Sequence, residues 1–136
     1  MISNHNVLIV ENDDNVLGIL SRALQGEGYS VCPAHGGYES VALAFNTQFN
    51  VALIDTLIQP TGWVETVRQL NKISPRTKII LMTSYDMDSD LIHQVLNIDV
   101  QQIMSKPFHL EDLFYSINAL CPDLQNVSRQ LHEVMS

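Results

Sequence analysis

VALIDTLIQPTG, residues 51–62, is the stretch of sequence that decides the fold. Four apolar residues lead directly into Asp55, and a short loop with Pro60 and Gly62 follows. A continuous apolar run of this length, ended by turn residues, predicts a strand that is covered on both faces of a sheet. At the carboxyl end of such a strand, Asp55 can cap a turn or helix, or it can belong to a ligand site.

Apolar strands, polar loops and helical patterns alternate on both sides of this stretch. The alternation predicts an α/β fold, a doubly wound parallel sheet of five strands flanked by five helices and joined by right-handed crossovers. The fifth strand is less apolar than the others, so we expect it at an edge of the sheet. The predicted strands are Val7–Val10, Tyr29–Cys32, Val51–Asp55, Lys78–Met82 and Gln101–Ser105.

Helices are predicted where apolar residues recur at spacings of three and four. The first helix begins at a cap from Asp13 or Asp14 and ends at Gly26 and Gly28. Ser74 and Pro75 close the third helix, because proline disfavours helix in the residue before it. The predicted apolar sides are Val41, Ala42 and Phe45 in the second helix, Leu91, Ile92, Val95 and Leu96 in the fourth, and Leu110, Leu113, Phe114, Ile117 and Leu120 in the fifth.

Composition narrows the class of protein. A chain of 136 residues, 46% hydrophobic and 16% charged, suits one compact domain with a real core. Its net charge of -8 argues against a surface that binds nucleic acid or an anionic membrane, which needs clustered Lys and Arg. No apolar run approaches the roughly 18 residues of a membrane span, and the N-terminus lacks a basic region followed by an apolar core, so we expect no signal peptide. Cys32 and Cys121 lack metal-ligand spacing, so we expect reduced thiols in a cytoplasmic protein.

Polar residues follow the predicted strands at the edge where their carboxyl ends meet. Residues far apart in the sequence converge at such an edge. Two carboxylates about 4 Å apart repel by roughly 4 kcal/mol at an effective dielectric constant of 20, so the site needs a cation. Lys106 or a bound metal ion can supply it. The residues concerned are Glu11, Asn12, Asp13, Asp55, Thr83 and Lys106.

This set of groups suits the transfer of a phosphoryl group to an aspartate. A carboxylate nucleophile beside Mg²⁺, with a lysine and a hydroxyl to hold equatorial oxygens, is what that reaction requires. Hard oxygen ligands that leave room for water suit Mg²⁺. Each residue also has an ordinary role, since Lys106 can be a surface charge and Thr83 a cap at a strand end. Their coincidence on one edge favours a single site.

On these residues the chain resembles the receiver domain of bacterial two-component response regulators, over residues 6 to about 121. The resemblance implies a flavodoxin-like, receiver-type fold. We expect the receiver domain at 1–121 and a C-terminal tail at 122–136 that forms either a short helix or a linker. The matching segments are Val7–Glu11 with Asp13, Gly28–Val31, Ala34 with Gly37 and Glu39, Leu53–Asp55, Thr83, and Lys106–Phe108.

The resemblance also implies a role for each site residue. Asp55 is the implied phosphoacceptor, with a sensor histidine kinase or a phosphotransfer protein as donor, and Thr83 and Lys106 are the implied contacts of the phosphoryl group. A signalling domain of this kind is not an enzyme, although it assists its own phosphorylation and dephosphorylation. The bond Lys106–Pro107 is implied to be cis. The implied Mg²⁺ ligands are Glu11, Asn12, Asp55 and the backbone carbonyl of Leu57.

Departures from the family pattern bear on the metal and on the switch. Asn12 stands where the family has a carboxylate ligand, so we expect weak Mg²⁺ binding. Ile103 replaces an aromatic residue that couples to the threonine, and it can form no hydrogen bond. The positions of Pro60 and Gly62 indicate a loop remodelled by about one residue, and Asp99–Val100 replaces a glycine-alanine pair.

Two interpretations of function stay open. Asp55, Thr83 and Lys106 together favour a phosphoacceptor switch, whereas Asn12 and Ile103 favour a degenerate receiver that binds partners constitutively without phosphorylation. A flavin- or nucleotide-binding protein is disfavoured, because the loop after the first strand is acidic rather than rich in glycine.

The tail adds a hypothesis about association. Its apolar residues recur at spacings of three and four, which indicates a narrow stripe for a partner helix or a second copy, while a frayed tail or linker is the alternative. A homodimer is therefore one form that this association can take, and we hypothesise that phosphorylation changes association. The residues of the stripe are Leu124, Val127, Leu131 and Val134.

Overall fold

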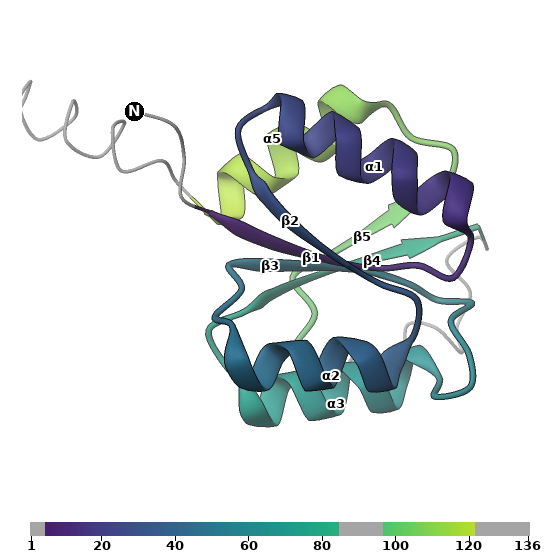
Figure 1. Ribbon diagram of the computed structural model, residues 1–136, viewed down its shortest axis with the longest axis vertical. Coiled ribbons are helices and arrows are strands. Elements are labelled where there is room, and N and C mark those ends of the chain that lie inside the picture. The colour runs from purple at the N-terminus through teal and green to yellow at the C-terminus, as the bar shows by residue number, and fades with distance from the viewer. Residues whose placement is uncertain (1–4, 85–96, 122–136) are drawn as a thin grey trace, which may run out of the picture.

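A computed structural model describes residues 5–84 and 97–121, which form a single five-stranded parallel sheet with helices on both faces (Figure 1). The strand order is β2-β1-β3-β4-β5. The predicted doubly wound fold is confirmed. The predicted helix around Leu91–Leu96 and the tail at 122–136 lie outside the described residues. The strands are β1 (Asn6–Val10), β2 (Ser30–Ala34), β3 (Val51–Asp55), β4 (Lys78–Thr83) and β5 (Gln102–Ser105).

Four helices belong to the described residues. In Figure 1, α1 and α5 cover one face of the sheet and α2 and α3 cover the other. Every one of them is too short or too polar to cross a bilayer. The helices are α1 (Asp14–Gly26), α2 (Gly37–Asn46), α3 (Trp63–Ile73) and α5 (Leu110–Leu120).

The central strand β3 is buried along its whole length. Successive side chains of a strand point to opposite faces, so β3 contributes to two cores. Leu53 packs into the core under α1 and α5, and Ile54 packs into the core under α2 and α3. Full burial of such a side chain stabilises a fold by about 1.5–3 kcal/mol. The two-sided burial explains why this segment is continuously apolar.

Two less apolar strands form the edges of the sheet. β5 lies at one edge, as its composition predicted. β2 lies at the other and covers Ser30–Ala34, later than the predicted Tyr29–Cys32. It pairs only with β1, so the missing N–H of Pro33 can lie on the open side.

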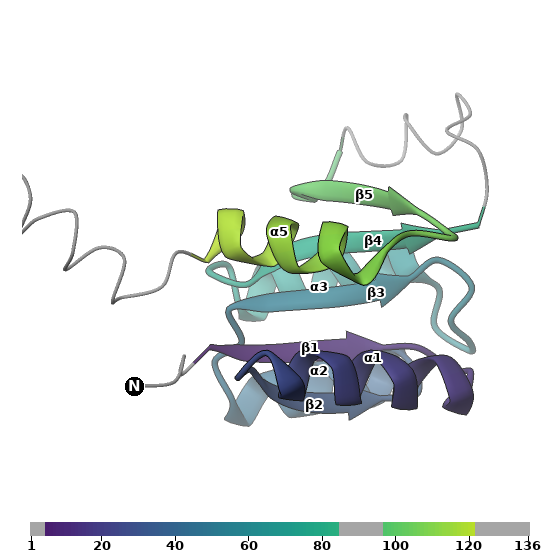
Figure 2. The same ribbon diagram turned by 90° about the horizontal axis from the view of Figure 1, so that it is seen from above.

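The register of the strands aligns their carboxyl ends. Val10 of β1 is paired with Ile54 of β3, one residue before Asp55. Asp55 is paired with Met82, and the next residue of β4, Thr83, is paired with Ser105 of β5. The arrows of the strands in Figure 2 accordingly point in the same direction, so their carboxyl ends lie at one end of the sheet. This edge is where the polar residues were predicted to meet.

The first helix is capped as its sequence predicted. Asp13 Oδ1 accepts hydrogen bonds from the backbone N–H groups of Asn15 and Val16, at 2.9 and 3.2 Å. Such a cap is worth about 0.5–2 kcal/mol. After the last turn, Gly28 has φ 97°, a conformation that costs a residue with a Cβ atom far more than it costs glycine.

The predicted apolar side of α2 is wrong for two of its three residues, Ala42 and Phe45. Ala42 is exposed and Phe45 is 70% exposed, while Val41 is only partly buried. The buried residues of this helix are the small ones, Gly37, Ser40 and Ala44. Close packing against α3 is the reason, because a Cβ atom at position 37 would collide with Thr66 Oγ1.

Candidate functional site

Three strand ends bring two carboxylates and one ammonium group together. Glu11 follows β1, Asp55 ends β3, and Lys106 follows β5. The Nζ atom of Lys106 lies 3.0 Å from Glu11 Oε2 and 3.0 Å from Asp55 Oδ1. The sequence predicted this convergence, and the structure supplies its geometry, in which one lysine serves both acidic groups.

Burial makes this arrangement electrostatically significant. Glu11 and Asp55 are 2% and 3% exposed, while 26% of the Lys106 side chain is exposed. Carboxylates removed from water cost several kcal/mol each unless they are paired and hydrogen-bonded. Burial alone would lower the pKa of Lys106. The hydrogen bonds and charges of Asp55 and Glu11 outweigh that effect and raise it above its usual range, so the lysine stays charged at neutral pH.

Loop amides hold the second oxygen of each carboxylate. The backbone N–H of Leu57 donates to Asp55 Oδ2 at 3.2 Å. That of Asp13 donates to Glu11 Oε1 at 3.2 Å. Each carboxylate thus has one oxygen on the lysine and one on its own loop, which orients both groups. The carboxyl group of Asp13 itself caps α1.

Thr83 lies next to Lys106 through the backbone. It is fully buried at the end of β4, and its carbonyl accepts a 2.7 Å hydrogen bond from the N–H of Lys106. The bond Lys106–Pro107 is cis, as the resemblance implied. Ile103 of β5 is paired with Leu81, and it packs with the core on the α2 and α3 side of the sheet.

The donors at this edge fit a hard divalent cation. Among the described residues, no group of three or more His, Cys, Asp or Glu side chains could hold a metal ion by itself. Glu11 and Asp55 therefore need additional oxygen donors, and exposed Asn12 and the carbonyl of Leu57 stand in the adjoining loops. Mg²⁺ is commonly bound by one or two carboxylates and keeps several waters, so the set fits that ion better than it fits zinc.

A histidine network beside the site was not predicted. His35 Nε2 lies 2.8 Å from Asp14 Oδ1, and the His35 backbone N–H donates to Glu39 Oε2 at 2.9 Å. The ring thereby links the starts of α1 and α2. The hydrogen bond to Asp14 is the main cause of a raised pKa at His35, and Glu39 adds to it. The signal in the sequence was a histidine four residues before an acid, at a helix start.

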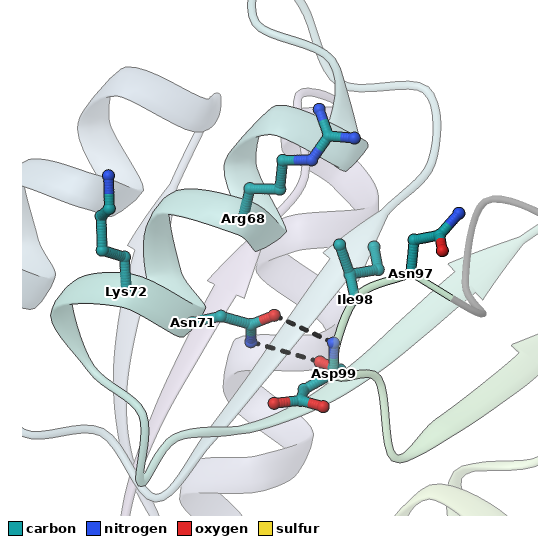
Figure 3. Close-up of a pocket in the computed structure, with 6 residues that line it drawn as sticks. All are labelled: Arg68, Asn71, Lys72, Asn97, Ile98 and Asp99. Atoms are coloured by element: carbon teal, nitrogen blue, oxygen red, sulfur yellow. Dashed lines mark hydrogen bonds between the residues drawn. The ribbon is translucent and has the colours of Figure 1, made fainter.

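A hollow of about 640 Å³ lies away from this site, between the second half of α3 and the segment before β5 (Figure 3). The side chain of Asn71 lines this hollow. Its Nδ2 donates to the carbonyl of Asp99 at 3.2 Å, and its Oδ1 accepts from the Asp99 N–H at 3.0 Å. This clamp holds the segment that departs from the family pattern. The lining residues are Arg68, Asn71, Lys72, Asn97, Ile98 and Asp99.

Comparison with known proteins identifies the family of this chain. Residues 7–118 match the family described as response regulator receiver domain, and the chain belongs to it. The chain is 32% identical over 114 residues to the uncharacterized transcriptional regulatory protein YkoG of Bacillus subtilis (strain 168). That match covers 84% of this chain and 50% of YkoG, so the chain spans about half the length of such relatives.

Solved structures agree with this assignment. A CheY-like response regulator receiver domain protein from Methanospirillum hungatei JF-1 is 27% identical, with a TM-score of 0.80, and the match covers 96% of this chain and 99% of that one. A response regulator from Burkholderia pseudomallei, with a phosphorylated aspartic acid, calcium ion and citrate, matches with a TM-score of 0.77 at 22% identity. This second match covers 93% of this chain and 72% of that one, and it supports the fold.

Proposed function

We propose that this receiver domain is a phosphoacceptor that takes a phosphoryl group at Asp55 from a histidine kinase or phosphotransfer protein in the cytoplasm. The observation that carries the proposal is the buried Asp55 carboxylate, held 3.0 Å from Lys106 Nζ at the carboxyl end of the central strand. The domain supplies the nucleophile and its electrostatic surroundings, and it changes its interaction surface in response. It is a signalling domain rather than an enzyme.

The proposed transfer is a substitution at phosphorus. A carboxylate oxygen of Asp55 forms the new O–P bond while the bond from phosphorus to the donor breaks, and the leaving group keeps that electron pair. Lys106 then pairs with an oxygen of the transferred group while Glu11 still holds its ammonium. Thr83 supplies a hydroxyl at the neighbouring strand end. Bound Mg²⁺ would neutralise charge on the transferred group, with Glu11, Asn12, Asp55 and the Leu57 carbonyl as its ligands.

Intact-mass measurement tests this proposal directly. Incubation with acetyl phosphate and Mg²⁺ is expected to add one phosphoryl group to the wild type and none to Asp55→Asn. A matched control is Asp99→Asn. It removes an acid from the segment before β5, at the amino ends of the strands, and should leave the adduct intact. An adduct that survives in Asp55→Asn would show that another residue is the acceptor.

A degenerate receiver without phosphorylation is the second candidate. Asn12 supports it, because an amide in place of a carboxylate removes one negative charge from the metal site. The phosphorylated aspartic acid and calcium ion of the Burkholderia pseudomallei structure support the first candidate instead. A wild-type protein that gains no mass in the same experiment would favour the degenerate receiver.

A further inference from the structure

Three exposed positions of α2 form an apolar stripe. Tyr38 and Phe45 are 72% and 70% exposed, and exposed Ala42 lies between them. Spacings of four and three place these side chains on one face of the helix. The stripe faces away from the sheet, because the inner side of α2 consists of Gly37, Ser40 and Ala44.

A polar stripe lies beside it on α3. Glu65, Gln69 and Lys72 are exposed and also follow spacings of four and three. Glu65 is held within its helix, where its Oε1 accepts from Gln69 Nε2 at 3.3 Å and its Oε2 lies 3.8 Å from Arg68 Nη1. Lys72 points away from the clamp between Asn71 and Asp99 (Figure 3).

The two helices form one continuous surface. Figures 1 and 2 place α2 and α3 side by side on the same face of the sheet. Each leads from the end of one strand to the start of the next in a parallel sheet, so the two helices run in the same direction. Gly37 at the start of α2 contacts Thr66 in the first half of α3. Tyr38 and Glu65 therefore lie toward one end of this surface, and Phe45 and Lys72 lie toward the other.

We infer that the α2–α3 surface binds a second copy of this chain about a two-fold axis. The two-fold axis lies in the interface and perpendicular to the helices, so it reverses their direction and places Tyr38 against the partner's Phe45 and Ala42 against the partner's Ala42. The small central residue lets the helices approach while the aromatic rings pack on either side. The same rotation brings Glu65 toward the partner's Lys72, and this pair occurs twice. The positions of the charged residues and the sizes of the apolar side chains are thus both complementary to an antiparallel copy of the same surface.

The expected dimer is weak and reversible. An aromatic side chain buries about 150–250 Å², so two per copy bring the interface to the low end of specific ones, below about 1,200 Å². The net charge of -8 on each copy also opposes association at long range. Dimerisation through this surface does not require phosphorylation of Asp55, so a monomeric wild type would leave the proposed phosphoacceptor function untouched, and the reverse also holds.

Sedimentation equilibrium of the whole chain at micromolar to millimolar concentrations tests the surface. The wild type should form dimers, and Phe45→Ser should weaken dimerisation by about tenfold or more, as expected for a buried aromatic anchor. Tyr115→Ser is the matched control, because Tyr115 is 78% exposed on α5, on the other side of the sheet, and its loss should change nothing. A wild type that stays monomeric throughout would overturn the inference, and so would dimerisation sensitive to Tyr115→Ser but not to Phe45→Ser.

Charge reversal tests the orientation of the two copies. Glu65→Lys and Lys72→Glu should each weaken dimerisation about threefold, and the double variant should return to within about twofold of the wild type. Unchanged thermal unfolding of all three variants would establish that the fold is intact. A double variant that dimerises no better than the single variants would overturn the two-fold arrangement.

Discussion

At the scale of single residues, the site depends on one lysine that serves two acids. Glu11 and Asp55 are almost completely buried, and Lys106 provides the positive charge that both of them contact at 3.0 Å. Without it, two neighbouring carboxylates would face each other in a poorly solvated space. The lysine therefore stabilises the fold itself, in addition to the contact with the phosphoryl group that we propose for it.

Replacing Lys106 tests its structural contribution. Lys106→Met should lower the free energy of unfolding at neutral pH by about 1.5–3 kcal/mol, the usual worth of hydrogen bonds to charged groups. Because the pKa of Lys106 is raised above 10.5, the stabilisation is complete below that pH and is lost as pH rises through the higher pKa of the folded state. Urea unfolding across this pH range should show that the free energy of unfolding of the wild type declines relative to that of Lys106→Met.

Lys106→Arg is the control for this prediction. An arginine keeps its charge throughout the range, so its stability relative to Lys106→Met should not decline. Equal declines in the lysine and arginine proteins would assign the alkaline loss to other groups.

The weak Mg²⁺ binding that we expect also follows from a single residue, Asn12. Asn12→Asp restores a carboxylate beside Glu11, and we expect it to bind Mg²⁺ about tenfold more tightly, which corresponds to about 1.4 kcal/mol. Calorimetric titration measures the affinities, with the fluorescence of Trp63 as a second probe, since this residue follows the loop after Asp55.

Asn15→Asp adds the same charge within exposed residues of α1 and should leave the affinity nearly unchanged. If Asn12→Asp binds Mg²⁺ no better than the wild type, then Asp13 or Glu11 already supplies enough charge.

At the same scale, the sequence predicts those residues whose position follows from a strand end. Glu11, Asp55 and Lys106 meet because parallel strands share one carboxyl edge, a rule that needs no side-chain detail. The contact of His35 with Asp14 follows no such rule. It depends on two loops lying together, as the 3.0 Å hydrogen bond from the Glu11 N–H to the Ala34 carbonyl shows.

At the scale of elements, the packing of α2 on α3 shows where apolar periodicity fails. Counting large apolar residues placed Phe45 inside, but the helices approach so closely at Gly37 that only small side chains fit between them. The loop after Asp55 joins this contact, because a Cβ atom on Gly36 would lie 2.7 Å from the Gln59 carbonyl oxygen. Close approach is a tertiary property, and the sequence signals it only through two adjacent glycines.

The close contact predicts a large effect for a small change. Gly37→Ala should destabilise the protein by about 1–3 kcal/mol, because the added methyl group collides with Thr66 Oγ1 and meets Thr61 Cβ at 3.0 Å. Chemical unfolding measures the loss.

Gly26→Ala is the matched control for this change. A Cβ atom at position 26 would meet nothing within 4 Å, so this variant should be as stable as the wild type or more stable by about 0.5–1 kcal/mol. Equal stabilities for the two alanine variants would mean that α2 moves away from α3 without cost.

At the scale of the whole molecule, the buried strands determine the fold, whereas the proposed signalling would act through exposed surfaces. The fold was predictable because β1, β3 and β4 are continuously apolar and two-sided burial leaves few alternatives for such strands. Exposed surface residues are not constrained by burial in this way, so the sequence predicts them less well. Ile103 has no hydroxyl group through which its side chain could hydrogen-bond, so the proposed phosphorylation signal would have to leave the domain by another route. Association between copies is such a route.

We expect the tail at 122–136 to be responsible for any association that depends on phosphorylation. The stripe of Leu124, Val127, Leu131 and Val134 is absent from a chain that ends at residue 121, whereas that chain keeps α2 and α3. Light scattering of both chains, with and without acetyl phosphate and Mg²⁺, should show a phosphorylation-dependent rise in mass in the whole chain alone. Association through α2 and α3 should persist in both chains and in Asp55→Asn, since neither change touches that surface. A whole chain whose mass is the same before and after phosphorylation would contradict the role of the tail.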